Sequence, residues 1–277
     1  MESIKLDVKE LEKLYQKIGL INPAGGQYKE RIGKSRQIYD YLIQITAALK
    51  KLSTKNEIVL LDCACGKSYL SFIVYYYCHE VLKKNIRIIG VDSNPELIFK
   101  CNNIAFEMGF TNLAFYCSNI IDFKSEYRPD IVYSLHACNT ATDQTIAKGI
   151  IEKAKYIMTV SCCQHTTMGQ IRKHPLTSIT RFKPFKERIV DMVSDSMRAL
   201  LLEQYGYNVD IFEFTSTKNT AKNIMLRAVS CNSNTVKEEV AEIDYQKLLN
   251  LFHIRPAAEM YLNKDNIFLK FIYQMKG

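Results

Sequence analysis

The sequence predicts a doubly wound α/β fold, with a mostly parallel sheet of about seven strands that includes one antiparallel strand. Short buried apolar runs alternate with longer amphipathic runs between residues 57 and 230. The first of these runs ends in an acid and a small-residue turn at 62–68, and the last two follow each other closely, as strands of a hairpin do. The 277 residues are enough for one such domain with helical additions at both ends.

The N-terminal extension over residues 1–56 is expected to hold two helices. Residues 1–20 and 28–52 each carry apolar side chains at helical spacing, which predicts that one face of each helix packs on the rest of the protein. The Asn-Pro-Ala-Gly-Gly run at 22–26 breaks the helical pattern between them.

Strands and helices alternate regularly from residue 58 onward. Strands are expected at 58–61, 86–91, 113–117, 130–134 and 156–161, and helices at 69–81, 95–109 and 143–155. Pro95 suits the first turn of its helix, and Gly109 suits the position after its end. Parallel strands joined by right-handed crossovers bind ligands beyond their carboxyl ends.

The last part of the sheet is expected to contain the antiparallel strand. A long helix over 185–205 is followed by strands at 208–214 and 223–229, with only a polar turn between the two strands. Residues 57–230 are therefore predicted to form the central domain, and residues 231–277 a C-terminal helical tail.

Basic residues are unevenly distributed along the chain. The net charge is +8, and the segments 1–56 and 165–190 each carry a positive excess. The cations of the second segment are Arg172, Lys173, Arg181, Lys183, Lys186 and Arg188. Basic surfaces on an otherwise near-neutral chain favour an anionic partner such as nucleic acid. A surface that only keeps the protein in solution has the same pattern.

Composition also limits the compartment. The longest apolar runs fall short of the roughly 20 residues of a membrane span, and the first residues lack the build of a signal peptide. Nine cysteines, an odd number, are scattered as in proteins of reducing compartments, and their spacing is not that of a zinc site. We expect a cytoplasmic protein without a membrane anchor, a disulfide framework or a bound metal.

The turn at 62–68 is the expected ligand site, because its small residues let a ligand approach the backbone at a helix start. Gly66-Lys67-Ser68 supplies only the second half of a phosphate-binding loop, and Gly66 is the single glycine left of a dinucleotide fingerprint. A third motif, the acid-x-Gly-x-Gly-x-Gly turn of S-adenosylmethionine (SAM) methyltransferases, appears with Ala64 and Ser68 in place of two glycines. A turn without any ligand also fits these residues.

Asp92, at the tip of the second strand, favours the third motif. An acid at that position can accept hydrogen bonds from both ribose hydroxyls of a nucleoside cofactor held on the first turn. A phosphate-binding loop does not need this acid. In a dinucleotide site, the side chains that replace the missing glycines would crowd the pyrophosphate. The alternative role for Asp92 is a helix N-cap before Pro95.

Five stretches of the chain resemble the class I SAM-dependent methyltransferases, which have a Rossmann-like fold. They are most similar to the group containing the tRNA acceptor-stem ribose methyltransferases and related methyltransferase-like proteins. The stretches are 62–71, 90–94, 135–143, 161–165 and 222–228. The most specific part is His136-x-Cys138 with Ala141-Thr142-Asp143, followed by Cys162-Cys163. Asn119 departs from the family, which has an acid there for the adenine amino group.

The resemblance implies SAM as the cofactor and assigns residues to its site. The implied cofactor-binding residues are Asp62, Cys63, Ala64, Cys65, Gly66, Lys67, Ser68, Asp92, Ser93, Asn119, Ile120, Leu135 and His136. His136 and His165 are the catalytic candidates, and His136 can be a general base, a cofactor contact or a residue that only holds its loop. The fourth strand lacks the Asn/Asp-Pro-Pro-aromatic motif, which argues against methylation of an exocyclic amine.

The expected function is SAM-dependent methylation of RNA, with tRNA and rRNA as the candidate substrates. The basic segment leaves the fifth strand at the ligand-binding edge, and it also holds His165, His174, Phe182 and Phe185, whose rings can stack on a splayed base. Two alternatives stay open. One is a methyltransferase fold that has lost catalysis and serves as an RNA-binding or scaffold protein, and the other is a small-molecule methyltransferase.

Overall fold

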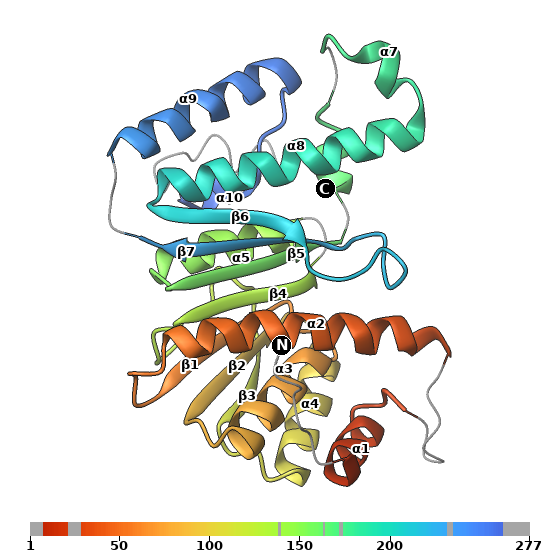
Figure 1. Ribbon diagram of the computed structural model, residues 1–277, viewed down its shortest axis with the longest axis vertical. Helices are drawn as coiled ribbons and strands as arrows, with labels where there is room; N and C mark the ends of the chain where they lie inside the picture. The colour runs from red at the N-terminus through yellow and green to blue at the C-terminus, as the bar shows by residue number, and fades with distance from the viewer. Residues whose placement is uncertain are drawn as a thin grey trace. The chain divides into compact units, whose positions relative to one another are not determined.

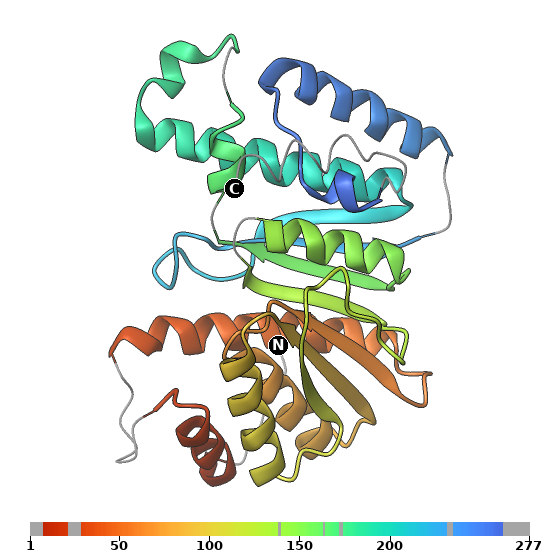
Figure 2. The same cartoon turned by 180° about the vertical axis from the view of Figure 1, so that it is seen from behind.

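The computed structural model describes residues 8–21, 29–137, 140–162, 164–171, 174–231 and 235–262. Within them the strands form a seven-stranded sheet in the order β3-β2-β1-β4-β5-β7-β6 (Figures 1 and 2). The strands are β1 (Ile58–Cys63), β2 (Ile86–Asp92), β3 (Leu113–Cys117), β4 (Ile131–Ala137), β5 (Tyr156–Ser161), β6 (Tyr207–Glu213) and β7 (Ile224–Ser230). Strand β1 pairs in parallel with β2 and β4, and β2 with β3, whereas β5 and β7 pair antiparallel. The predicted mixed, mostly parallel sheet is confirmed.

The helices of the described residues flank this sheet. They are α1 (Val8–Lys17), α2 (Lys29–Lys51), α3 (Tyr69–Tyr75), the π-helix η1 (Tyr76–Val81), α4 (Pro95–Glu107), α5 (Thr140–Ile151), α6 (His165–Met168), α7 (Thr177–Thr180), α8 (Lys183–Gln204), α9 (Thr235–Phe252) and α10 (Ala258–Leu262). The chain divides into two compact units, the first comprising Met1–Tyr133 with Glu213–Ile224 and the second Ser134–Phe212 with Met225–Gly277. The domain boundaries expected at 56 and 230 stay a prediction.

Unit 1 is built around β1, in which every residue is buried. Its position between β2 and β4 explains the continuous apolar run in the sequence, because such a strand meets protein on both faces. Helix α3 is likewise buried along its whole length and contacts α2, while α4 packs against β2 and β3. These packed elements fix the ends of β1 and β2, where the candidate site begins.

Helix α4 begins where the sequence predicts and ends at Glu107, two residues before the predicted end at Gly109. The Asn94 side chain accepts hydrogen bonds from the N–H groups of Glu96 and Leu97, and a proline occupies the first turn. Gly109, with φ of +69°, follows the end of the helix. The N-cap is therefore Asn94, so the alternative of Asp92 as the N-cap is wrong.

Unit 2 packs its helices around β5 and β7. Helix α5 lies against β5, α10 lies against α5, and α9 runs alongside α8 (Figure 1). Val190, Met197 and Leu201 are buried on one face of α8, which is the amphipathic pattern that predicts this helix. Across the described ranges, every helix is too short or too polar to span a bilayer.

Two predicted boundaries near the carboxyl end of β4 are wrong. Strand β4 continues to Ala137 instead of ending at residue 134. Helix α5 begins at Thr140 and ends at Ile151, earlier than the predicted range 143–155. Lys153 adopts a left-handed φ of +51°, which a continuing helix does not allow.

Candidate functional site

Asp62, the acid that ends the apolar run of β1, lies in a buried hydrogen-bond network of unit 1. It is only 4% exposed, and its Oδ2 accepts hydrogen bonds from Ser71 Oγ at 2.6 Å and Ser68 Oγ at 3.3 Å. The Ser71 hydroxyl also lies 2.5 Å from the Tyr133 hydroxyl. Burial raises the pKa of Asp62 to about 7, although both serines act to lower it. A cationic ligand beside this carboxyl would favour its ionised form.

The backbone of the turn adopts the left-handed conformation that glycine favours, even at the positions where the motif's glycines are replaced. The φ angles are +56° at Ala64, +54° at Gly66 and +51° at Ser68, all in the left-handed region. Residues with a Cβ adopt this conformation at a cost of roughly 1–2 kcal/mol. A Cβ built on Gly66 meets nothing within 4 Å, so there is open space beside the backbone at the centre of the turn.

Asp92 ties the tip of β2 to this turn. Its Oδ2 accepts a hydrogen bond from the Gly66 N–H at 2.8 Å, and its Oδ1 accepts one from the Asn94 N–H at 3.0 Å. Each carboxylate oxygen has a second lone pair, so the side chain can still accept bonds from two ribose hydroxyls. Gly90 permits close packing nearby, because a Cβ there would lie 2.3 Å from the Phe115 ring.

Three cysteines, Cys63, Cys65 and Cys101, lie beside the turn. Cys63 is buried, and the Cys101 thiol donates a weak hydrogen bond to the Gly66 carbonyl at 3.6 Å. Burial raises the pKa of Cys101 to about 12 and also raises the pKa of Cys65. The Cys65 and Cys101 thiols therefore stay protonated at neutral pH, which makes them packing groups and not nucleophiles.

The remaining predicted cofactor residues of unit 1 lie near the surface. Lys67, Ser93 and Asn119 are exposed, and Ile120 is buried. The Asn119 Oδ1 accepts a hydrogen bond from the Ile121 N–H at 3.0 Å. An asparagine also carries donors that an acid lacks, so adenine would meet a different hydrogen-bond pattern than in the family that the chain resembles.

The unit 1 residues fit SAM, a cation that also carries a ribose. Asp62 and Asp92 supply acidic groups, and the turn between Ala64 and Ser68 leaves the backbone open to a ligand. When bound, SAM supplies an electrophilic methyl group. The role of this chain would then be to hold the ribose and the amino-acid tail of SAM. Holding them orients the methyl group toward an acceptor. The individual cofactor contacts stay predictions.

The other predicted site residues belong to unit 2. Leu135 and His136 are half-buried at the end of β4, and His136 has a left-handed φ of +58°. The Ala137 carbonyl accepts hydrogen bonds from Thr142 Oγ1 at 2.9 Å and from the Cys162 N–H at 3.4 Å. These bonds hold the ends of β4 and β5 together beside His136, whose catalytic role stays a prediction.

Several predicted residues fall at or beyond gaps in the described chain. His165 is the first residue of the one-turn helix α6. The residues that lie outside the described ranges are Cys138, Asn139, Cys163, Arg172 and Lys173. The roles expected for His165, Arg172 and Lys173 therefore stay predictions.

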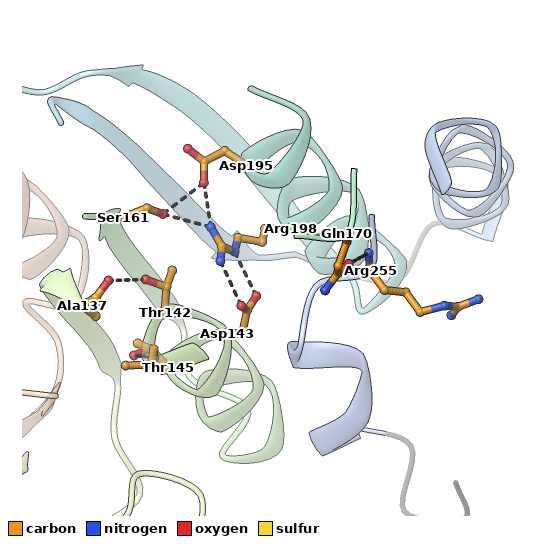
Figure 3. Close-up of polar contacts among 10 residues, drawn as sticks. Ala137, Thr142, Asp143, Thr145, Ser161, Gln170, Asp195, Arg198 and Arg255 are labelled. Atoms are coloured by element: carbon orange, nitrogen blue, oxygen red, sulfur yellow. Dashed lines mark hydrogen bonds and ion pairs between the residues drawn. The ribbon is translucent and has the colours of Figure 1, made fainter. Parts of the chain in front are cut away.

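A buried ionic network, the Arg198 network, holds the part of unit 2 that contains the signature residue Asp143 (Figure 3). Arg198, 2% exposed, donates hydrogen bonds to both carboxylate oxygens of Asp143 at 2.9 Å. It also donates to Asp195 at 3.0 Å and to Ser161 Oγ at 3.1 Å, and the Ser161 hydroxyl donates to Asp195. Burial raises the pKa of Asp195 against the opposing effect of Arg198. Asp143 therefore anchors the start of α5 to the end of β5.

Sequence analysis missed Arg198. The signal that could have found it is an arginine on the apolar face of a helix, between Met197 and Leu201 and one turn after Ser194. A cation at such a position requires buried acids nearby. The spacing alone does not say that Asp143, 55 residues earlier, is one of them.

The described part of the basic segment is exposed and contains aromatic rings. Phe182 and Phe185 are 48% and 47% exposed, and the Arg181 guanidinium lies 4.6 Å from the centre of the Phe182 ring. Lys183 has an exposed ion pair with Glu187 at 4.0 Å, a kind of contact that contributes at most about 1 kcal/mol. These groups are accessible to a ligand.

His174 differs from the stacking role expected for it. Its Nε2 lies 3.0 Å from Thr180 Oγ1, and its Nδ1 accepts a hydrogen bond from the Leu176 N–H at 3.2 Å. Its ring also contacts Phe252, with 5.6 Å between ring centres. These contacts make His174 a residue that holds the segment to α9 rather than a free stacking platform.

Cations of the N-terminal segment have partners in unit 1. Lys17 pairs with Glu107, Lys55 pairs with Asp130, and the Lys34 ammonium lies 4.6 Å above the Tyr69 ring. Among the described residues, no three His, Cys, Asp or Glu side chains group as a metal site would need. The cysteines at 63, 65, 78, 101, 117, 162 and 231 are free thiols.

Comparison with known proteins identifies a domain in this chain. Residues 33–170 match the family model described as a methyltransferase domain. A Drosophila melanogaster protein, "Glutathione S-transferase C-terminal domain-containing protein homolog", is 25% identical over 224 residues, which are 80% of this chain and 34% of that protein. The chain thus spans about a third of the length of this curated relative.

Two solved structures are similar to this chain to different degrees. A putative class I SAM-dependent methyltransferase from Listeria monocytogenes is 11% identical, with a TM-score of 0.51 over 85% of this chain and 72% of the other. Magnesium protoporphyrin IX methyltransferase from Synechocystis PCC 6803, crystallised with SAM, is 14% identical, with a TM-score of 0.47 over 82% of this chain and 99% of the other. The first of these likenesses supports the fold.

Proposed function

We propose that this chain, a SAM-dependent methyltransferase, transfers the methyl group to RNA. The methyltransferase domain covers residues 33–170, and SAM is the cofactor. The choice of RNA depends on surface chemistry in unit 2 and goes beyond the domain match. tRNA and rRNA are the abundant RNAs with which to test it.

The observation that carries the proposal is the exposed segment Arg181–Arg188. It presents Arg181, Lys183 and Arg188 together with two half-exposed phenylalanine rings. Cations at such positions neutralise phosphates, and aromatic faces stack on unpaired bases, which is how single-stranded RNA is usually bound. A small uncharged acceptor would need neither group.

The chemistry requires a positioned acceptor and a route for its proton. A nucleophilic oxygen or nitrogen of the acceptor would take the methyl group in one displacement. The bond between the methyl carbon and the sulfonium sulfur would break, S-adenosylhomocysteine would be the leaving group, and the acceptor's proton would pass to a base. His136, at the end of β4, is the titratable group proposed as that base, because a histidine titrates near neutral pH. The main requirement of such a displacement is that the protein positions the methyl donor and the acceptor.

A methylation and binding assay tests the proposal. We expect label from SAM to enter tRNA or rRNA, and we expect the variant Arg181→Ala, Lys183→Ala, Lys186→Ala, Arg188→Ala to bind RNA with a flatter salt dependence. For each phosphate contact that is lost, the slope of log affinity against log salt concentration should become shallower by about 0.7 to 0.9. A matched control removes four exposed lysines elsewhere, Lys83, Lys100, Lys124 and Lys218.

The outcomes separate the alternatives. An unchanged salt slope in the first variant means that these cations do not contact phosphate, and a small acceptor then replaces RNA. RNA binding without any use of SAM would indicate a scaffold that has lost catalysis. A loss in the control variant equal to that in the first would show that the effect is only one of net charge.

A further inference from the structure

Gln164 is an unpaired polar residue in the interior of unit 2. It lies three residues after the end of β5, at the position that precedes α6. Its backbone carbonyl accepts a hydrogen bond from the Met168 N–H at 2.7 Å, but its side chain does not cap the helix. The side chain is buried, with the residue 6% exposed, and neither its Oε1 nor its Nε2 has a partner in the described parts of the chain.

An unpaired buried carboxamide is costly and rare. A buried donor or acceptor that makes no hydrogen bond costs more free energy than a typical hydrogen bond contributes. Gln37 in unit 1 gives the ordinary case, because it is 7% exposed and its Nε2 donates to the Asn219 carbonyl at 2.8 Å. Gln164 has the same burial without that compensation, which suggests a partner that the free chain lacks.

The strand end that leads to Gln164 is rigidly held. Ser161, the last residue of β5, accepts a hydrogen bond from Arg198 and donates one to Asp195 (Figure 3). The carboxyl ends of such strands are where doubly wound sheets bind their ligands. A polar group just beyond a fixed strand end is pre-organised for recognition.

The geometry points to Gln164 as a residue that reads the hydrogen-bonding edge of an unpaired base in the RNA acceptor. A carboxamide places one acceptor and one donor side by side, which complements the adjacent donor and acceptor on a nucleobase edge. This inference rests on the proposed RNA substrate. Because the amide is enclosed in the free chain, a base reaches it only after a local opening of the structure around it.

Thermal unfolding of two matched variants tests whether the free chain uses this amide. Gln164→Met keeps the side-chain volume and removes the unpaired groups, so we expect its Tm to equal or exceed that of the wild type. Gln37→Met removes a hydrogen bond and leaves the Asn219 carbonyl unpaired, so we expect its Tm to fall by about 2–6 °C. An equal fall in both variants would show that Gln164 has a structural partner and would overturn the inference.

Filter binding with 12-nucleotide homopolymers of A, C and U tests the role in recognition. We expect the wild type to discriminate between these RNAs and Gln164→Met to lose about 10-fold of that discrimination, with the salt slope and the SAM affinity unchanged. If RNA binding depends on the basic side chains of Arg181–Arg188, but wild type and Gln164→Met have the same base preference, this inference is overturned while the proposed function stands. If the wild type binds none of these RNAs, nor tRNA and rRNA, the proposed function fails and this inference with it.

Discussion

Asp92 accepts a hydrogen bond from the backbone N–H of Gly66, so the carboxylate at the tip of β2 holds the turn that follows β1. The side chain that shapes this turn is thus the same one that is predicted to accept hydrogen bonds from a ribose. The acid that sequence analysis places against the cofactor is also part of the scaffold.

Replacing Asp92 with alanine should weaken SAM binding. The change removes the hydrogen bonds to the turn and those expected to the ribose, which at about 1.5–3 kcal/mol for bonds to a charged group is roughly a 10- to 150-fold rise in Kd. Calorimetric titration measures it. Asp210→Ala, which removes an exposed partner of Arg227, is the control and should leave the Kd unchanged. Equal affinity in wild type and Asp92→Ala would contradict the assigned site.

Glycine at position 64 should stabilise the protein. Ala64 has a φ of +56°, and glycine adopts this region freely, so Ala64→Gly should raise the free energy of unfolding by about 0.5–1 kcal/mol after the entropy cost of glycine. Urea unfolding measures the change. The matched substitution Ala114→Gly in β3 should instead lower stability by about 0.5–1 kcal/mol. A loss at both positions would mean that Ala64 is not strained.

Stability should fall as the pH rises from about 4 to about 7 through the titration of Asp62. In the unfolded chain its pKa is near 3.8, and in the folded chain burial raises that pKa to about 7. Between these values the folded state binds the extra proton, so the proton stabilises the fold at low pH and is lost as pH rises. The full span is on the order of 4 kcal/mol.

Urea unfolding of wild type and Asp62→Asn across this pH range provides the test. The asparagine variant should show a flatter profile, although Asp195, whose pKa burial also raises, adds a dependence of the same sign. Parallel profiles for the two proteins would be evidence that Asp62 is ionised in the fold throughout the range.

The two acids that contact Arg198 should contribute unequally to the free energy of unfolding. Asp143 receives two hydrogen bonds from the guanidinium, so Asp143→Asn removes the closest counter-charge of a buried cation and should cost about 3–5 kcal/mol. Asp195→Asn should cost less than about 1 kcal/mol, because burial already raises the pKa of this carboxyl and so disfavours its charge. Unfolding curves of the two variants at pH 7 decide it, and equal losses would refute the asymmetry.

Sequence reasoning predicted the helices and strands that have local signals. It missed the side-chain contacts between residues that are far apart in the sequence. The apolar run of β1, Asn94-Pro95 before α4 and Gly109 after it are each read from a few adjacent residues. The pairing of Arg198 with Asp143 links residues 55 positions apart, and no periodicity encodes it. The same limit explains why His174 was expected to stack on a base, since its contact with Phe252 joins α9 to the segment before α7.

The candidate site was predicted in outline for the same reason. The turn 62–68 and Asp92 have a recognisable order along the chain, so their meeting in unit 1 could be expected. The unpaired state of Gln164 could not, because it depends on which neighbours fail to reach its amide. A short ordered motif is thus easier to find from sequence than a single residue whose surroundings come from distant parts of the chain.

The close approach of Gly90 to Phe115 constrains how this protein can evolve. The phenylalanine ring occupies the volume that any side chain at position 90 would need, only 2.3 Å from the missing Cβ. A mutation at either position alone therefore meets an overlap or leaves a void, while a paired exchange of volume avoids both. In an alignment of divergent relatives, these two positions on adjacent strands should covary, with a larger residue at 90 accompanied by a smaller one at 115.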